Sequence, residues 1–224
     1  MAAFRNARER RLWLLAAILV GAIYGSAYFV QFLLDALRSR GVLEAAIWSA
    51  LLVAAAAGLA LLVRQRPGRW EVALLLVAAA IYALWLRELR IIQERIHLIE
   101  YGALGALAYA ALRERWQQAA RPPTIESMSA APPPPPRRRW QRWPTLWAIL
   151  IAAAAGWGDE LVQGLLPNRV YDLRDVATNA EAAALCVLVV AARDRLRSHA
   201  ARRRLATSLV EPHGDGAAPT AAIE

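Results

Sequence analysis

Residues 156–179 read GWGDELVQGLLPNRVYDLRDVATN, and this stretch decides how the rest of the chain is interpreted. It gathers ionisable and amide side chains between two apolar runs long enough to cross a bilayer. Because an ionisable group is costly at membrane depth, such groups indicate either a partner or a task. The side chains concerned are Asp159, Glu160, Gln163, Arg169, Asp172, Arg174, Asp175 and Asn179.

The apolar residues, 58% of the 224, are concentrated in blocks rather than spread at the period of a half-buried helix or strand. Blocks of about 20 residues match a helix that crosses a hydrocarbon layer about 30 Å thick. A soluble bundle is disfavoured, because no amphipathic helices remain to cover the blocks. The predicted fold is all-α, a multi-pass transmembrane helical bundle with six spans at residues 12–34, 43–63, 70–89, 93–112, 146–166 and 176–192.

The net charge of +9 comes entirely from arginine, since the chain has no lysine. In a six-span arrangement most arginines fall in the N-terminus, the second and fourth loops and the tail, which are on the same side. The excess of positive charge on the cytoplasmic side predicts that both termini are cytoplasmic. No basic surface interleaved with aromatic residues is present, so nucleic acid is not an expected partner.

The predicted organisation follows from these blocks. Five consecutive prolines and an arginine triplet predict an extended linker between two groups of helices. The segments are a cytoplasmic N-terminus (1–11), the first four spans (12–112), a cytoplasmic Pro/Arg-rich linker (113–144), the last two spans with their polar outer loop (145–192), and a cytoplasmic tail (193–224). In the tail we expect a helix that leaves the membrane and then disorder.

The rise of an α-helix converts positions into depths. Asp159 on the fifth span is predicted to lie about 10 Å below the outer surface, and Glu100 on the fourth span the same. Asn179 on the sixth span is predicted to lie about 6 Å below that surface. Three helices therefore place polar groups at one level. We call these candidates the polar cluster: His97, Glu100, Tyr101, Asp159, Glu160, Gln163, Arg169, Asp172, Asp175 and Asn179.

Several chemistries suit the polar cluster. It holds more acids than nearby cations, which suits proton handling or a cationic or hydroxylated ligand. Arg169 could pair with the acids or hold an anionic group such as phosphate. A metal bound by His97 and two acids is chemically possible, but no tight motif such as His-Glu-x-x-His occurs. The sequence therefore assigns no metal, no cofactor and no catalytic residue.

Two segments resemble the VanZ-like membrane protein family. Residues 94–105, ERIHLIEYGALG, are similar to the family's His-x-x-x-Tyr-x-x-Leu helix, and residues 159–179 are similar to its second signature. The resemblance covers residues 90–192, and it departs from the family where Ala180, Glu181 and Ala182 replace an expected glycine. It implies a bacterial inner-membrane protein acting at the cell envelope, with a role in resistance to glycopeptides of the teicoplanin type.

The leading hypothesis is an extracytoplasmic polar pocket that acts on or binds a cell-envelope component, such as a lipid-linked precursor. A second hypothesis is a structural or partner-binding protein of the bilayer, in which the charges only pair helices. A third is a small transporter or proton pathway. The third needs a polar route to the cytoplasm, and residues 103–112, 146–155 and 185–192 carry no Asp, Glu, His, Lys or Arg.

Overall fold

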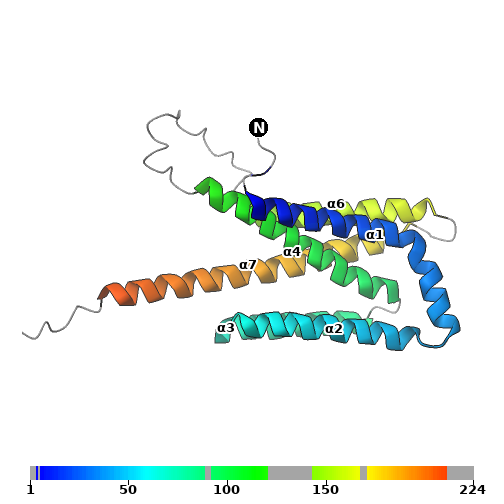
Figure 1. The fold of residues 1–224 in the computed structure, drawn as a ribbon, viewed down its shortest axis with the longest axis horizontal. Coiled ribbons are helices and arrows are strands. Elements are labelled where there is room, and N and C mark those ends of the chain that lie inside the picture. Colours follow the sequence, from blue (N-terminus) through cyan, green and yellow to red (C-terminus); the bar gives the residue numbers. More distant parts are fainter. Residues whose placement is uncertain (1–3, 5, 89–91, 121–142, 167–170, 211–224) are drawn as a thin grey trace, which may run out of the picture.

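The computed structural model describes residues 4, 6–88, 92–120, 143–166 and 171–210, and within them it contains helices and no strands. Figure 1 shows long helices that run in alternating directions, so that loops gather at two opposite ends. The all-α prediction is confirmed for this part of the chain. The helices are α1 (Ala7–Ser39), α2 (Leu43–Arg64), α3 (Arg69–Glu88), α4 (Ile92–Ala120), α6 (Pro144–Gly164) and α7 (Leu173–Val210).

The bundle is formed by α1, α4, α6 and α7, and α4 contacts all three of the others. The helix α3 packs on α7, and α2 contacts α1. Figure 1 shows α2 and α3 together on one side of the bundle. The side chains of α2 are mostly exposed, including Leu52, Val53, Leu59 and Val63. An apolar helix with so much exposed surface is what a bilayer would cover.

Four helices are long and apolar enough to cross a membrane by length and composition: α2, α3, α6 and residues 173–208 of α7. Six spans were predicted, and the other two helices, α1 and α4, are not among these four. The helix α4 carries Glu100, His97 and several other polar residues. Because neighbours cover it on three sides, α4 needs less apolar surface than a helix that faces lipid.

Two predicted boundaries can be compared with the observed helix ends. The helix α4 continues to Ala120, so residues 113–120 belong to the bundle rather than to the expected linker. The helix α7 continues to Val210, so this part of the expected tail is ordered helix. Both extensions are rich in alanine and arginine, which have high helix propensity. Residues 121–142 and 211–224 lie outside the described part of the chain.

Local signals in the sequence set several helix ends. The side chain of Asn6 accepts a hydrogen bond from the Glu9 N–H at 2.6 Å, which caps the start of α1. Gly41 has φ +67° between α1 and α2, and its N–H donates to the Arg38 carbonyl. A glycine just after a helix readily adopts this left-handed conformation. Pro144 opens α6, where a missing N–H removes no helical bond.

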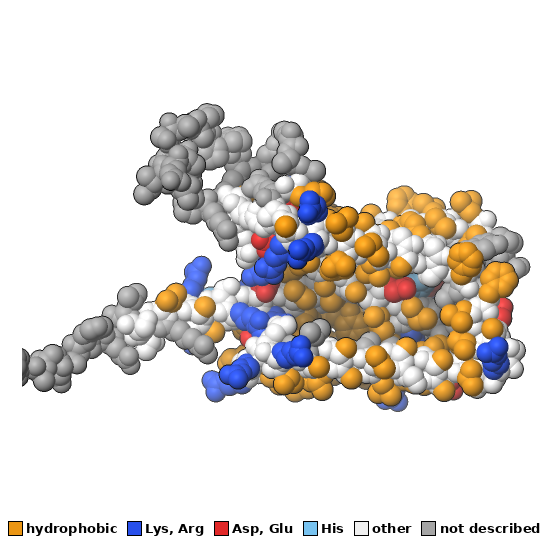
Figure 2. All heavy atoms as spheres, in the orientation of Figure 1, with side chains coloured by type: hydrophobic (Ala, Val, Ile, Leu, Met, Phe, Trp, Pro, Cys, Tyr) orange, Lys and Arg blue, Asp and Glu red, His pale blue; other side chains and the backbone are white. Residues whose placement is uncertain are grey.

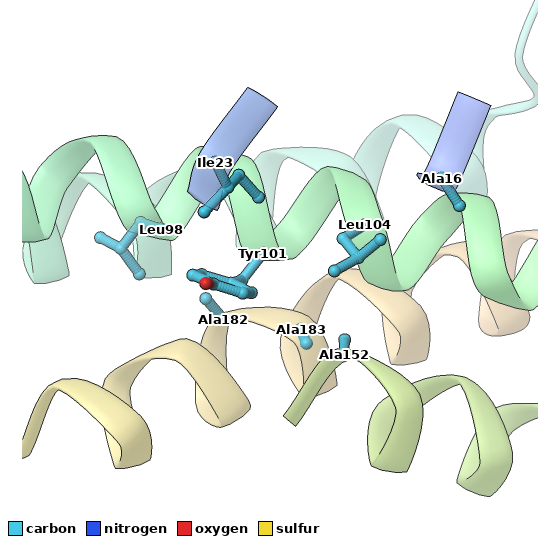
Figure 3. Close-up of a cluster of buried hydrophobic side chains, with 8 residues drawn as sticks. All are labelled: Ala16, Ile23, Leu98, Tyr101, Leu104, Ala152, Ala182 and Ala183. Atoms are coloured by element: carbon cyan, nitrogen blue, oxygen red, sulfur yellow. The ribbon is translucent and has the colours of Figure 1, made fainter. Parts of the chain in front are cut away.

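Small residues let α4, α6 and α7 approach closely. Figure 3 shows Tyr101 and Leu104 of α4 facing Ala182 and Ala183 of α7 and Ala152 of α6. A Cβ added at Gly105 would lie 3.2 Å from the Ala183 carbonyl oxygen. Without a hydrophobic driving force in lipid, helices associate through such close packing. This core positions the polar side chains that lie next to it, toward the N-terminus of α4.

At one end of the bundle acidic side chains pair with arginines, and we call this the arginine end. Figure 2 shows most of the visible basic side chains at that end, whereas the middle of the visible face carries few charges and many hydrophobic side chains. Glu71 of α3 accepts hydrogen bonds from Arg193 at 3.0 Å and Arg197 at 2.8 Å. The other ion pairs of the arginine end are Arg113–Asp194, Arg115–Glu9 and Arg8–Glu114.

Candidate functional site

The helix α6 contributes one buried polar face. Asp159, Glu160 and Gln163 are 0%, 1% and 4% exposed, and they share this face with Gly156. The opposite face carries Trp157 and Leu161, which are half exposed. Positions three and four apart lie on one side of a helix, so the sequence order alone turns these polar groups inward. The Gln163 side-chain amide donates to Asp159 Oδ2 at 2.9 Å.

The helix α4 brings a histidine, an acid and a phenol to the same place. His97 Nδ1 lies 3.2 Å from Glu100 Oε2 and 3.9 Å from Asp159 Oδ2. The rings of His97 and Tyr101 are tilted toward each other with centroids 5.8 Å apart. The Tyr101 hydroxyl faces Asp159, but the two do not form a hydrogen bond of standard geometry. The polar groups of α4 therefore meet those of α6.

The start of α7 closes the site. Asn179 is buried against α6, because a Cβ added at Gly156 would lie 2.9 Å from the Asn179 Cβ. The Asp172 N–H donates to Glu160 Oε2 at 3.4 Å. The Asp172 carboxylate accepts from the Arg174 N–H at 2.8 Å, as an N-cap does. Asp172 thus caps α7 with its side chain and contacts Glu160 through its backbone.

The buried polar atoms at this site are incompletely satisfied by the described residues. Asp159 Oδ1, Glu160 Oε1 and both amide atoms of Asn179 are buried and have no hydrogen-bond partner there. A buried polar group without a partner costs about 1–3 kcal/mol, and more if it is charged. Such atoms occur where a protein binds water, an ion or a ligand. The three residues come from two helices and surround one small region.

The ten candidates do not all meet. The structure brings together His97, Glu100, Tyr101, Asp159, Glu160, Gln163 and Asn179. Asp172 is exposed at the rim and Asp175 is half-buried in the first turn of α7. Arg169 lies outside the described residues, so its pairing with the acids stays a prediction.

Among the described residues the site is a largely buried cluster. His97 and Glu100, with side chains 15% and 25% exposed, lead from it to the surface. In Figure 2, acidic and histidine side chains appear together on a face that is otherwise largely hydrophobic. A hollow of about 680 Å³ lies instead at the arginine end, beside Arg113, Trp116 and Trp143. The described part of the site is therefore a buried cluster with a partly exposed edge, and the outward-opening pocket stays a prediction.

One residue that contributes to the site, Tyr24, was not predicted from the sequence. The Tyr24 hydroxyl of α1 donates to the Ala155 carbonyl at 2.7 Å and lies against Gly158, where an added Cβ would collide with it. Tyr24 is a phenol about half way along the predicted first span. The depth argument places it about 15 Å below the outer surface, deeper than the other candidates, and so did not group it with them.

No protein-family model, no curated protein and no solved structure matches this chain. The resemblance to the VanZ-like family consequently stays a prediction from the two quoted segments.

Proposed function

We propose that this chain is a six-span protein of the bacterial inner membrane with both termini in the cytoplasm. Four helices have the length and composition of spans, and α1 and α4 pack along them in alternating directions. The arginine end supports the orientation, because arginine-rich segments favour the cytoplasmic side. The polar cluster would then lie toward the extracytoplasmic side.

We further propose that the polar cluster binds a lipid-linked or headgroup-like component of the cell envelope. The observation that carries this proposal is a contrast between the two ends. At the arginine end, Glu9, Glu71 and Asp194 each have an arginine partner. In the polar cluster no arginine among the described residues pairs with Asp159 or Glu160, and the ion-pair partner of Asp159 is His97, 3.9 Å away. A cluster that served only to join helices would have its acids paired as the arginine end does.

The partly exposed edge favours a ligand that arrives along the membrane. His97 and Glu100 are partly exposed, so a headgroup could reach them while its lipid chains stay in the bilayer. This proposal agrees with the resemblance to the VanZ-like family, whose namesake is associated with resistance to teicoplanin-type glycopeptides. Resistance by this chain is part of the same proposal.

Native mass spectrometry of the full chain with added lipid-linked envelope precursor tests this function. Asp159→Asn and Asn179→Ala should each lower precursor binding by about 10-fold, since each loses one polar contact worth about 1–2 kcal/mol. Glu181→Gln is the matched control, because Glu181 is an exposed acid on α7 near the same end. Equal binding by all variants, or no binding by the wild type, would exclude the polar cluster as the binding site.

A further inference from the structure

Three side chains of the polar cluster offer metal ligands at short range. One ligand atom from each of His97, Asp159 and Glu160 lies within 4.8 Å of the other two. Asp159 and Glu160 are buried, and His97 is largely so. We propose that these residues, which we call the triad, bind a divalent transition-metal ion of the zinc type. The inference deepens the proposed function and rests on it for access to the triad from the extracytoplasmic side.

The spacing of the triad is close to that of a bound site. Metal–ligand bonds of about 2.0–2.2 Å place the ligand atoms of a tetrahedral site about 3.4 Å apart. The triad atoms, at up to 4.8 Å, need to close by about 1.4 Å at most. Asp159 and Glu160 are adjacent on α6, and Nδ1 of His97 on α4 lies 3.9 Å from Asp159 Oδ2, so the proposed site requires only side-chain rotation of this size.

Electrostatics supplies the main reason for an ion. Two buried carboxylates with one neighbouring histidine leave negative charge uncompensated by the described residues. Removing a carboxylate from water costs several kcal/mol unless a counter-charge is close. A divalent cation neutralises both acids at once. By contrast, the carboxylates at the arginine end already have guanidinium partners and show no such grouping with a histidine.

Asn179 gives a second observation that is independent of the acids. Its amide is 1% exposed and has no partner for its oxygen or its nitrogen among the described residues. It packs on Gly156, one helical turn before Asp159 and Glu160 on the same face of α6. A water molecule bound to the ion would supply the amide with a hydrogen-bond partner, as buried waters commonly do for such groups.

The neighbours of the triad have the arrangement that supports metal ligands. Glu100 lies 3.2 Å from His97 Nδ1, where it can accept the proton of a neutral imidazole. With Nδ1 held by Glu100, Nε2 would bind the ion once the ring has turned from the orientation in which Nδ1 lies 3.9 Å from Asp159 Oδ2. Gln163 donates to Asp159 Oδ2, and the Asp172 N–H donates to Glu160 Oε2. These bonds orient both carboxylates before an ion binds.

The ligand set narrows the choice of ion. One imidazole nitrogen and two carboxylate oxygens suit zinc, and also manganese or iron(II), better than a soft ion that prefers thiolates. Three protein ligands leave a fourth position for water or for a group of the bound envelope component. A phosphate or hydroxyl at that position would be recognised by the ion itself. Coordination to this cation would be the interaction by which the polar cluster selects an anionic headgroup.

The test is direct metal binding to the purified full chain in detergent, with its affinity tag removed. After chelator treatment and dialysis, isothermal titration with Zn²⁺, Mn²⁺ and Mg²⁺ should give one site that prefers Zn²⁺. His97→Gln, Asp159→Asn and Glu160→Gln should each weaken Zn²⁺ binding by at least about 100-fold, because each removes a ligand. Gln163→Ala should weaken it by about 10–100-fold, the range for a residue that supports a ligand.

Matched controls separate the triad from other donors. His199→Gln removes an exposed histidine of α7, and Glu181→Gln removes an exposed acid, and both should bind Zn²⁺ as the wild type does. Size-exclusion profiles show whether each variant is folded, and the near-isosteric Asp159→Asn and Glu160→Gln provide two independent tests. The inference is overturned if the wild type binds no stoichiometric metal, or if the triad variants match the controls.

The two proposals fail in different ways. Precursor binding that depends on Asp159 without any metal binding would end the metal inference and leave the proposed function standing. Zinc binding at the triad without precursor binding would end the proposed function and leave the metal inference standing. Titration with tetramethylammonium in place of metal shows whether the triad binds organic cations. If tetramethylammonium binds and Zn²⁺ does not, the inference is also overturned.

Discussion

Replacing Gly156 by alanine tests the close packing that shapes the polar cluster. The added Cβ would lie 2.9 Å from the Asn179 Cβ and 3.4 Å from Tyr101 Cε1. Ordinary contacts between carbon atoms are about 3.5–4.0 Å, so α6 and α7 must separate by about 0.6 Å or more. Asn179 would move away from Asp159 and Glu160 as a result.

The expected magnitude follows from two opposing effects. Overpacking a close contact costs about 1–3 kcal/mol. Alanine in place of glycine within a helix returns about 1 kcal/mol. The variant should therefore be less stable than the wild type by about 1 kcal/mol. At Gly21 nothing lies within 4 Å of an added Cβ, so Gly21→Ala keeps the helix gain and should be slightly more stable.

Unfolding of both variants in mixed micelles, titrated with SDS and followed by circular dichroism, measures the difference. The two free energies of unfolding should differ by about 2 kcal/mol, with Gly156→Ala the lower. The same samples should show weaker binding of precursor for Gly156→Ala alone. Equal stability of the two variants would refute the close approach of α6 and α7 at Asn179.

Two further predictions concern the opposite end and the orientation. Glu71→Gln should lower the free energy of unfolding by about 1–2 kcal/mol, because hydrogen bonds to charged groups are worth about 1.5–3 kcal/mol and Arg197 is partly screened by solvent. The control Glu44→Gln, at an exposed position, should leave the free energy of unfolding unchanged. Equal SDS midpoints for the two variants would contradict the prediction. In a Cys186→Ala background, an impermeant maleimide added to intact cells should label Leu173→Cys and spare Leu205→Cys, both exposed positions of α7. The opposite labelling would invert the proposed topology.

The fold could be predicted from the sequence to the extent that apolar blocks predict helices. The blocks at residues 43–63 and 146–166 closely match α2 and α6. The end of α4 was missed because residues 113–120 were interpreted as part of the linker. Arg113 of this segment instead binds Asp194 of α7 at 2.9 Å. Such long-range pairs carry no signal in local composition.

For the candidate site, the sequence predicted only the depth of each residue along its helix. Helix rise placed His97, Asp159 and Asn179 at one depth, and the structure brings these three helices together there. The rotation of each helix about its axis was not predictable, because it depends on which faces pack. That rotation made Asp172 a helix cap at the rim and buried Glu160 within 4.8 Å of His97 and Asp159. It also brought Tyr24 of α1 to the site.

The two ends of the bundle use acidic residues under different physical conditions. Glu71 is held between two guanidinium groups that are themselves partly exposed, so water shares in stabilising the charges. Asp159 and Glu160 are more deeply buried and meet one imidazole. A divalent ion would make a triad with a neutral imidazole electrically neutral, and two protons would also do so. Two protons, however, would leave the carboxyl groups without a role in recognising an anionic headgroup, whereas an ion with an open position attracts one. The charge balance of the triad and the anionic chemistry of envelope precursors therefore favour the same occupant.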